Sequence, residues 1–280
     1  LGQEFSGWVA QLEFARAGFA AISVDGPHGG LRNVTRGDEQ FLIFNTGNAA
    51  AIRDNIRQSA VELILTAHLL DTLTVDARAC PGLANARVRF DVEKVALFGH
   101  SMGATIAPLA LAFEPRFKAA ILSGAGGSWI ANLLHKQKPL PVHHLTSYLL
   151  GYAERLHPLT AGDPALSLLQ WSAEAADPPV YGARIEAHVL MLQGVVDHYI
   201  LPPMANATSL ALRLDLAGDE LDVTTLELAG YAPFRAVRAF SGGQVVPLPV
   251  RGNRPRAGGG ELTAVVVQHA GAGILDGHEI

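Results

Sequence analysis

Short apolar runs alternate with amphipathic segments along most of the chain, and this alternation predicts an α/β protein built on a parallel sheet. Near-continuous apolar character is typical of strands that are covered on both faces. Such buried strands are predicted at 95–98, 117–123, 188–194 and 263–269. Apolar or amphipathic helices are predicted at 54–73, 104–113 and 204–214.

The two ends of the chain carry less regular patterns. Apolar residues at helical spacing predict a helix over 3–17, and the apolar run at 19–25 predicts a buried strand after it. Toward the other end, strands are predicted at 221–228 and 244–250, the second at a sheet edge because it contains prolines. The Gly-, Arg- and Pro-rich segment 251–260 is predicted to be a mobile loop with solvated arginines.

Composition narrows the class of protein. The chain has 280 residues, 49% of them hydrophobic, which is enough for one large core, so we expect a single domain over 1–280. A net charge of −5 gives no electrostatic reason to expect a nucleic-acid or anionic-membrane partner. No apolar run approaches the ~20 residues of a transmembrane helix. The single cysteine excludes an internal disulfide framework.

A candidate nucleophile lies between the strand at 95–98 and the helix at 104–113. The intervening residues, Gly99-His100-Ser101-Met102-Gly103, follow the pattern G-x-S-x-G in its strand–turn–helix context. Glycines on both sides let the backbone turn sharply. The helix N-terminus behind the serine can stabilise developing negative charge. Ser101 is therefore the predicted nucleophile.

A serine hydroxyl needs a base, and the base needs a carboxylate to orient it. The strand at 188–194 leads to Asp197, and the strand at 263–269 leads to a loop that ends in His278. With Ser101 between strand and helix and these two residues after later strands, the sequence resembles an α/β-hydrolase. The resemblance implies a doubly wound, mostly parallel sheet flanked by helices, with Ser101, Asp197 and His278 as nucleophile, acid and base.

The same resemblance implies that the supplied sequence is a piece of a longer protein, trimmed at both ends. The predicted helix at 3–17 and strand at 19–25 match the family's first helix and fourth strand, so the early strands are expected to precede Leu1. The strand at 19–25 should then lie two interstrand spacings from the strand at 95–98. One oxyanion donor is expected to be the backbone N–H of Met102, and the second is assigned to the N–H of Leu1.

The segment 128–184 breaks the alternation of strands and helices. In the family this is where a cap or lid is inserted over the active site, and both ends of the segment adjoin predicted site strands. We therefore expect a helical cap that presents aliphatic and aromatic side chains to Ser101. The alternative is a helical decoration with a small core of its own.

No cofactor and no metal site are predicted. Asp25 and His28 could suggest a metal or catalytic pair, but a turn at a strand end is the favoured interpretation because Asp, Gly and Pro prefer such turns. No basic cluster stands near Ser101, Asp197 or His278 along the sequence, so little affinity for charged substrates is expected.

These residues predict a serine hydrolase that cleaves small carboxylic esters through an acyl-enzyme. A serine peptidase or an acyltransferase would use the same three residues, and a non-catalytic binding module with this fold is the alternative from another class. The sequence does not indicate an oligomeric state, and any targeting signal would lie upstream of Leu1.

Overall fold

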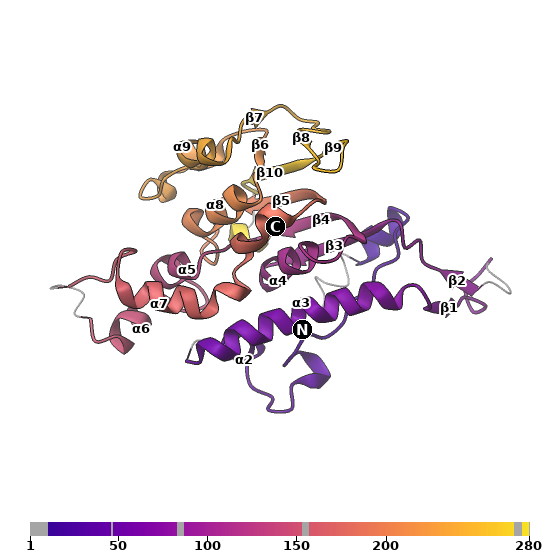
Figure 1. Cartoon of the computed structure of the whole chain (residues 1–280), viewed down its shortest axis with the longest axis horizontal. Coiled ribbons are helices and arrows are strands. Elements are labelled where there is room, and N and C mark those ends of the chain that lie inside the picture. Colours follow the sequence, from indigo (N-terminus) through magenta and orange to yellow (C-terminus); the bar gives the residue numbers. More distant parts are fainter. Residues whose placement is uncertain (1–10, 46, 83–86, 153–156, 272–275, 280) are drawn as a thin grey trace.

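A computed structural model describes residues 11–45, 47–82, 87–152, 157–271 and 276–279. Six strands form a parallel sheet in the order β3-β4-β5-β10-β6-β7, which runs through the middle of the molecule (Figure 1). The bounds of its strands are β3 Val95–His100, β4 Phe117–Ser123, β5 His188–Gly194, β6 Asp215–Ala217, β7 Val245–Val246 and β10 Ala264–His269. The four predicted buried strands are therefore confirmed as neighbours β3, β4, β5 and β10.

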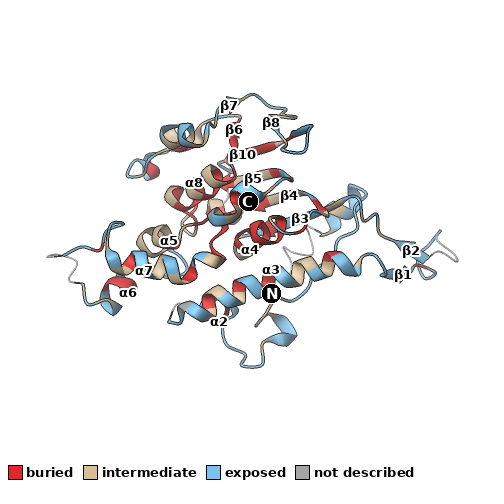
Figure 2. Ribbon diagram, viewed as in Figure 1, coloured by how far each residue is buried: buried red, intermediate tan, exposed pale blue. Residues whose placement is uncertain are grey.

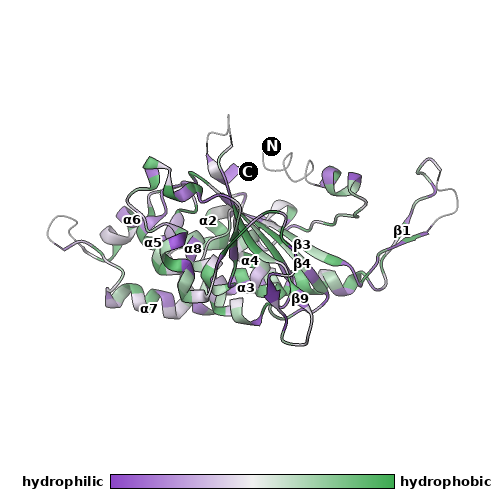
Figure 3. Cartoon of the chain, turned by 90° about the horizontal axis from the view of Figure 1, so that it is seen from above, coloured by the Kyte–Doolittle hydropathy of each residue, from purple (hydrophilic) through white to green (hydrophobic). Residues whose placement is uncertain are grey.

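The interior of the sheet is apolar because alternate side chains of its strands enter one core. Leu122 on β4, Met191 on β5 and Val266 on β10 are completely buried in that core. Figure 2 shows buried residues along β10 and along α4 beside the sheet. Burial of an aliphatic side chain of this size stabilises the fold by about 1.5–3 kcal/mol. Seen from above, the strands form a largely hydrophobic band in the middle of the chain (Figure 3).

Helices α3 (Ala49–Leu69) and α4 (Met102–Leu111) cover the sheet next to β3, with α4 against β3 and β4 and α3 against α4. Helix α3 begins earlier than the sequence pattern predicts. The side chain of Asn48 accepts hydrogen bonds from the N–H groups of Ala50 and Ala51, and this N-cap fixes the start of the helix. Helix α8 (Pro202–Ala211) follows β5, and α2 (Glu39–Phe44) precedes α3.

The predicted strand at 19–25 is wrong. Residues 11–16 are helical, and Phe14 contacts Phe98 of β3 edge-on, at 5.5 Å between ring centroids. Residues 19–25 form no strand, and Phe19, Ile22 and Val24 are about half exposed. A strand needs a hydrogen-bonded neighbour, and β3 is the edge of the sheet among the described residues. The distance predicted between a strand at 19–25 and β3 therefore does not apply, because residues 19–25 form no strand.

The described parts of the segment 128–184 contain helices, as predicted. Its helices α5 (Trp129–His135), α6 (Val142–Leu149) and α7 (Pro164–Ala173) lie together at one end of the molecule, far from the β1–β2 hairpin at the other end (Figures 1 and 3). Two 3₁₀ helices, η2 (Glu174–Ala176) and η3 (Pro178–Arg184), lead from α7 back toward β5. The hairpin strands are β1 (Thr74–Asp76) and β2 (Arg87–Arg89).

The region before β10 differs from its prediction. Residues 221–228, predicted as a strand, form the 3₁₀ turns η4 (Leu221–Val223) and η5 (Leu226–Leu228), and only Val245–Val246 of the segment 244–250 pairs as a strand. The helical turns α9 (Phe234–Val237) and η6 (Arg238–Ser241) lie between them. The turn η4 is held by a polar contact that no local sequence pattern reveals. The side-chain oxygen of Gln268 accepts hydrogen bonds from the N–H groups of Leu221 and Asp222.

The predicted loop at 251–260 is part of an antiparallel hairpin, β8 (Arg254–Pro255) with β9 (Glu261–Leu262). Arg254 pairs with buried Asp215 at 2.7 Å, and Arg256 donates to the carbonyl oxygen of Glu186. These two arginines thus fasten the hairpin to the sheet, which corrects the expectation that they are merely solvated. Elsewhere, no described helix combines the length and the apolar character needed to cross a membrane.

Candidate active site

Ser101 lies at the tight turn between β3 and α4, and its backbone is in a strained conformation with φ 54° and ψ −115°. The strain is held by local contacts: the Ser101 N–H donates to the carbonyl oxygen of Ser123 at the end of β4. A Cβ atom at Gly99 would lie 2.6 Å from the carbonyl oxygen of Gly103, so glycine is required there. At Gly103 a Cβ would meet nothing within 4 Å among the described atoms. The sequence argument for glycine thus holds at the first position only.

Asp197 lies in the loop after β5 and is 3% exposed. Its Oδ1 atom accepts hydrogen bonds from the N–H groups of Tyr199 and Ile200, each at 2.7 Å. These two donors fix the carboxylate and leave Oδ2 directed at His278.

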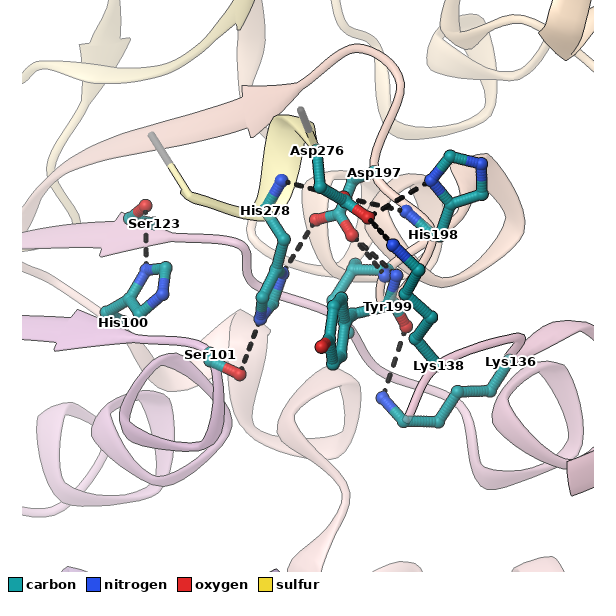
Figure 4. Close-up of polar contacts among 11 residues, drawn as sticks. His100, Ser101, Ser123, Lys136, Lys138, Asp197, His198, Tyr199, Asp276 and His278 are labelled. Atoms are coloured by element: carbon teal, nitrogen blue, oxygen red, sulfur yellow. Dashed lines mark hydrogen bonds and ion pairs between the residues drawn. The ribbon is translucent and has the colours of Figure 1, made fainter. Parts of the chain in front are cut away.

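His278 lies in the short turn η7 (Gly277–Glu279) after β10, and it joins the other two residues (Figure 4). Its Nδ1 atom is 2.9 Å from Asp197 Oδ2, and its Nε2 atom is 2.7 Å from Ser101 Oγ. The structure therefore brings together all three residues that the sequence assigned to the site. The imidazole is 7% exposed, stacks on Tyr199 at 4.5 Å between ring centroids, and lies 5.1 Å from the ring of His100.

The backbone N–H of Met102 is suited to bind an oxyanion beside Ser101. Met102 is the first residue of α4, so its N–H has no acceptor within the helix, and the positive end of the helix dipole lies there. The second predicted donor, Leu1, lies outside the described residues.

Two lysine side chains lie beside the loop that carries Asp197, although neither is near that residue in sequence. Lys136 and Lys138, just after α5, lie 5.9 and 5.8 Å from the centre of the Tyr199 ring. Lys136 Nζ also donates to the Tyr199 carbonyl oxygen, and burial lowers the pKa of this lysine while the charge of Asp197 opposes the shift. The fold thus brings these two lysines close to the site, although no basic cluster stands near Ser101, Asp197 or His278 along the sequence.

A cavity of about 400 Å³ adjoins the loop that carries Asp197. Val196 and His198 on the two sides of Asp197 contribute to its wall, as does Leu201. The remaining lining residues come from the segment after α5 and from the region of η5; they are Gln137, Glu227 and Tyr231. Polar groups thus make up most of the lining.

The residues that suggested a metal pair have other partners. Asp25 Oδ2 accepts the N–H of Leu31, and its carbonyl oxygen accepts from Arg32, so the pair belongs to a turn in which His28 has a positive φ of 65°. In the described parts of the chain, no three His, Cys, Asp or Glu side chains are grouped as they would be to hold a metal ion.

Sequence reasoning missed several residues that position the base. Gly124, at the end of β4, has φ +57°, and a Cβ there would lie 2.9 Å from the His278 ring. Tyr199 stacks on that ring, and Asp276 holds the backbone of the same turn. A signal was available for Gly124, since it follows a predicted buried strand next to the one leading to Ser101. No local pattern points to Tyr199 or Asp276.

The order of these loops decides the fold. Strand β3 leads to the serine, β5 to the aspartate and β10 to the histidine, in one parallel sheet flanked by helices, and the chain order is Ser–Asp–His. The chain has the α/β-hydrolase fold. Ser101, Asp197 and His278 follow the carboxyl ends of their strands, where α/β sheets bind ligands.

No protein-family model and no curated protein matches the chain. Among solved structures, acetyl xylan esterase 1 from Thermoanaerobacterium sp. is similar, with 16% identity, coverage of 90% of this chain and 66% of that one, and a TM-score of 0.47. A Pyrococcus horikoshii acylaminoacyl peptidase is 12% identical, with 69% and 23% covered and a TM-score of 0.38. A puromycin-hydrolysing peptidase of Mycobacterium tuberculosis is 14% identical, with 77% and 22% covered and a TM-score of 0.36.

The chain thus spans 66% of the length of the first of these proteins and about a quarter of the other two. At these TM-scores the assignment of the fold rests on the strand order and the site loops of this chain.

Proposed function

We propose that this chain is a serine hydrolase that cleaves small carboxylic esters. Ser101 Oγ attacks the ester carbonyl carbon while His278 Nε2 takes its proton, and the Met102 N–H donates to the oxyanion. As the tetrahedral intermediate collapses, the imidazolium gives that proton to the leaving alkoxide. Water then attacks the acyl-enzyme with the same base, which releases the acid and restores Ser101.

The observation that carries this proposal is the chain of two hydrogen bonds from Ser101 Oγ through His278 to Asp197, at 2.7 and 2.9 Å. Asp197 selects the imidazole tautomer with a proton on Nδ1 and leaves Nε2 as the acceptor for the serine proton. The carboxylate then stabilises the imidazolium that forms. A buried chain of this kind supports general-base activation of the serine rather than an inert turn.

We further propose that the segment 128–184 acts as a cap beside this site. Its contact with the acid loop supports the assignment: the N–H groups of Gln137 and Lys138 both donate to the carbonyl oxygen of His198. A cap beside the site controls the access of substrate to Ser101. Lys136 and Lys138 at this junction contact Tyr199, the residue that stacks on His278.

Ester hydrolysis is tested by kinetics with p-nitrophenyl esters of increasing acyl length, compared with peptide p-nitroanilides. We expect esters of short to medium acyl chains to be hydrolysed faster than any anilide, since each buried methylene adds about 0.8 kcal/mol until the pocket is filled. Faster cleavage of the anilides would replace the esterase assignment with the peptidase. Transfer of the acyl group to an added alcohol in preference to water would replace it with the acyltransferase.

A further inference from the structure

The turn that carries His278 is held by a second carboxylate, Asp276, which the proposed mechanism does not use. We propose that Asp276 is a positioning residue that fixes the base by tying together the base loop, the acid loop and the insert; this proposal rests on the proposed function. Asp276 is 4% exposed, and its two oxygens have four hydrogen-bonding partners.

The two oxygens of Asp276 together contact three segments of the chain (Figure 4). Oδ1 accepts the backbone N–H of His278 at 3.2 Å and that of His198 at 3.1 Å. Oδ2 lies 2.7 Å from Lys138 Nζ and 3.1 Å from His198 Nδ1. One carboxylate thus joins the base to the residue after Asp197 and to the lysine that follows α5.

The arrangement separates Asp276 from the role of Asp197. Asp276 accepts the backbone N–H of His278, whereas the imidazole Nδ1 pairs with Asp197. Asp276 therefore acts on the position of the base and not on its proton. The Gly277 N–H donates to the Val196 carbonyl oxygen at 2.6 Å, which adds a second tie between the same two loops.

Position matters because the imidazole must meet two partners at once. A shift of the turn by 1 Å would lengthen the bond to Ser101 or the bond to Asp197, and a misplacement of that size can cost about 100-fold in rate. The hydrogen bonds of Asp276 oppose such a shift, because its donors come from distant parts of the chain. His198 is 78 residues and Lys138 is 138 residues from Asp276 in the sequence.

The charge of Lys138 contributes to this cluster. Burial alone would raise the pKa of Asp276, but the hydrogen bonds from Lys138 and from the N–H groups of His198 and His278 outweigh it and lower the pKa. The carboxyl group is therefore ionised, as an acceptor of four donors must be. The same ion pair ties the proposed cap to the base loop.

The experiment compares Asp276→Asn with Asp215→Asn as a matched control. Asp215 is also 4% exposed and also binds one cation, Arg254, one backbone N–H, that of Gln244, and one further side chain, that of Asn253. It lies on β6, away from the site. A third variant, Lys138→Met, removes only the ion pair and leaves the backbone bonds of Asp276 in place.

We expect Asp276→Asn to lower kcat for p-nitrophenyl acetate by about 10- to 100-fold, with KM within about twofold, because the base is misplaced in a protein that still binds substrate. Lys138→Met should lower kcat by less, and Asp215→Asn should leave kcat within about twofold while it lowers Tm comparably. Equal losses of kcat in Asp276→Asn and Asp215→Asn would overturn the proposal, because both would then reflect general destabilisation.

A second measurement keeps the two proposals distinct. The downfield imidazole proton of His278, assigned by its loss in His278→Ala, reports the bond to Asp197 without any need for turnover. We expect this signal to weaken or exchange faster in Asp276→Asn and to be unchanged in Asp215→Asn. An unchanged signal in Asp276→Asn would contradict its positioning role even if the wild type hydrolysed no ester, whereas an inactive wild type with a weakened signal would contradict the ester hydrolysis alone.

Discussion

The three loops that carry Ser101, Asp197 and His278 differ from the segment 128–184 in how deeply their polar and apolar side chains are buried. Asp197 and His278 are buried, and all three side chains have hydrogen-bonding partners; Asp197 alone accepts three hydrogen bonds. In the segment 128–184, large apolar side chains lie at the surface, with Tyr148 81% and Trp171 74% exposed.

This difference indicates that the loops hold the three residues of the proposed reaction in place and that the outer face of the insert does not. A backbone N–H donor holds Asp197, the Tyr199 ring stacks on His278, and Gly124 leaves room for the His278 ring. Such fixed geometry is what a preorganised site requires. Residues 136–138 of the segment 128–184 form hydrogen bonds with the loops that carry Asp197 and His278. We therefore expect substitutions in the loops to change the rate of the chemical step and substitutions on the outer face of the insert to leave it unchanged.

The largest effect is expected for Asp197→Asn. The asparagine can still accept the Tyr199 and Ile200 N–H groups, but its amide selects the wrong tautomer of His278. We expect kcat to fall by about 10⁴-fold, as in triads elsewhere, while Tm changes little. Kinetics with p-nitrophenyl acetate measure this. A loss of tenfold or less would mean that another carboxylate orients the base.

Gly124→Ala should give the next largest loss. The new Cβ would lie 2.9 Å from the His278 ring, and φ +57° is unfavourable for alanine. We expect kcat to fall by about 100-fold and Tm to fall as well. Gly151→Ala in the insert is the matched control, since Gly151 also has a positive φ, of 74°, but a Cβ there meets nothing within 4 Å. Similar kinetics for the two variants would contradict the packing of Gly124 against the base.

Two buried carboxylates should respond to pH in opposite directions. Hydrogen bonds and the charge of Lys138 lower the pKa of Asp276, so its stabilisation is present above its unfolded pKa of about 4 and is lost as pH falls through the lower folded value. Burial raises the pKa of Asp177, in the insert, despite the hydrogen bonds of Gln170, Ser128 and Trp129. Its protonated form is favoured in the fold, so stability is gained as pH falls through the raised value.

The measurement is the difference in Tm between wild type and each Asp→Asn variant from pH 7 to pH 3. For Asp276→Asn the difference should shrink as pH falls below about 4, and for Asp177→Asn it should shift in favour of the wild type at low pH. Parallel curves for the two variants would contradict the opposite electrostatic environments of the loops and the insert.

The smallest effect is expected for Trp171→Ser on the outer face of α7. Because this side chain is 74% exposed, its loss should change the free energy of unfolding by no more than about 0.5 kcal/mol. Turnover of p-nitrophenyl acetate should stay within about twofold of wild type. A large loss of turnover in this variant would show that the outer face of the insert takes part in the reaction.

The sequence predicted best where a structural element is defined by its own residues. The bounds of β4, Phe117–Ser123, and β5, His188–Gly194, match the predicted runs, because each is a short apolar run bounded by a turn signal and each has neighbouring strands to pair with. Ser101 was found for a similar reason, since its strand, turn and helix are contiguous.

Predictions failed where the outcome depends on distant partners. Residues 19–25 have the composition of a strand but no neighbour with which to pair, and 221–228 turn because the side chain of Gln268 binds their backbone. The cluster around Asp276 joins Lys138, His198 and His278, and no periodicity reveals contacts across such separations. The sequence thus predicted the groups assigned to the chemistry but not the groups that position them.

The most direct test of the account is covalent labelling of Ser101 by a fluorophosphonate, located by mass spectrometry of the peptide that contains it. The account predicts rapid labelling of the wild type at Ser101, none in Ser101→Ala, and labelling slowed by several orders of magnitude in His278→Ala, because the serine then has no base at 2.7 Å from its Oγ. Absence of labelling in the folded wild type, or equal labelling rates in wild type and His278→Ala, would contradict the claim that Ser101 is a nucleophile activated by His278.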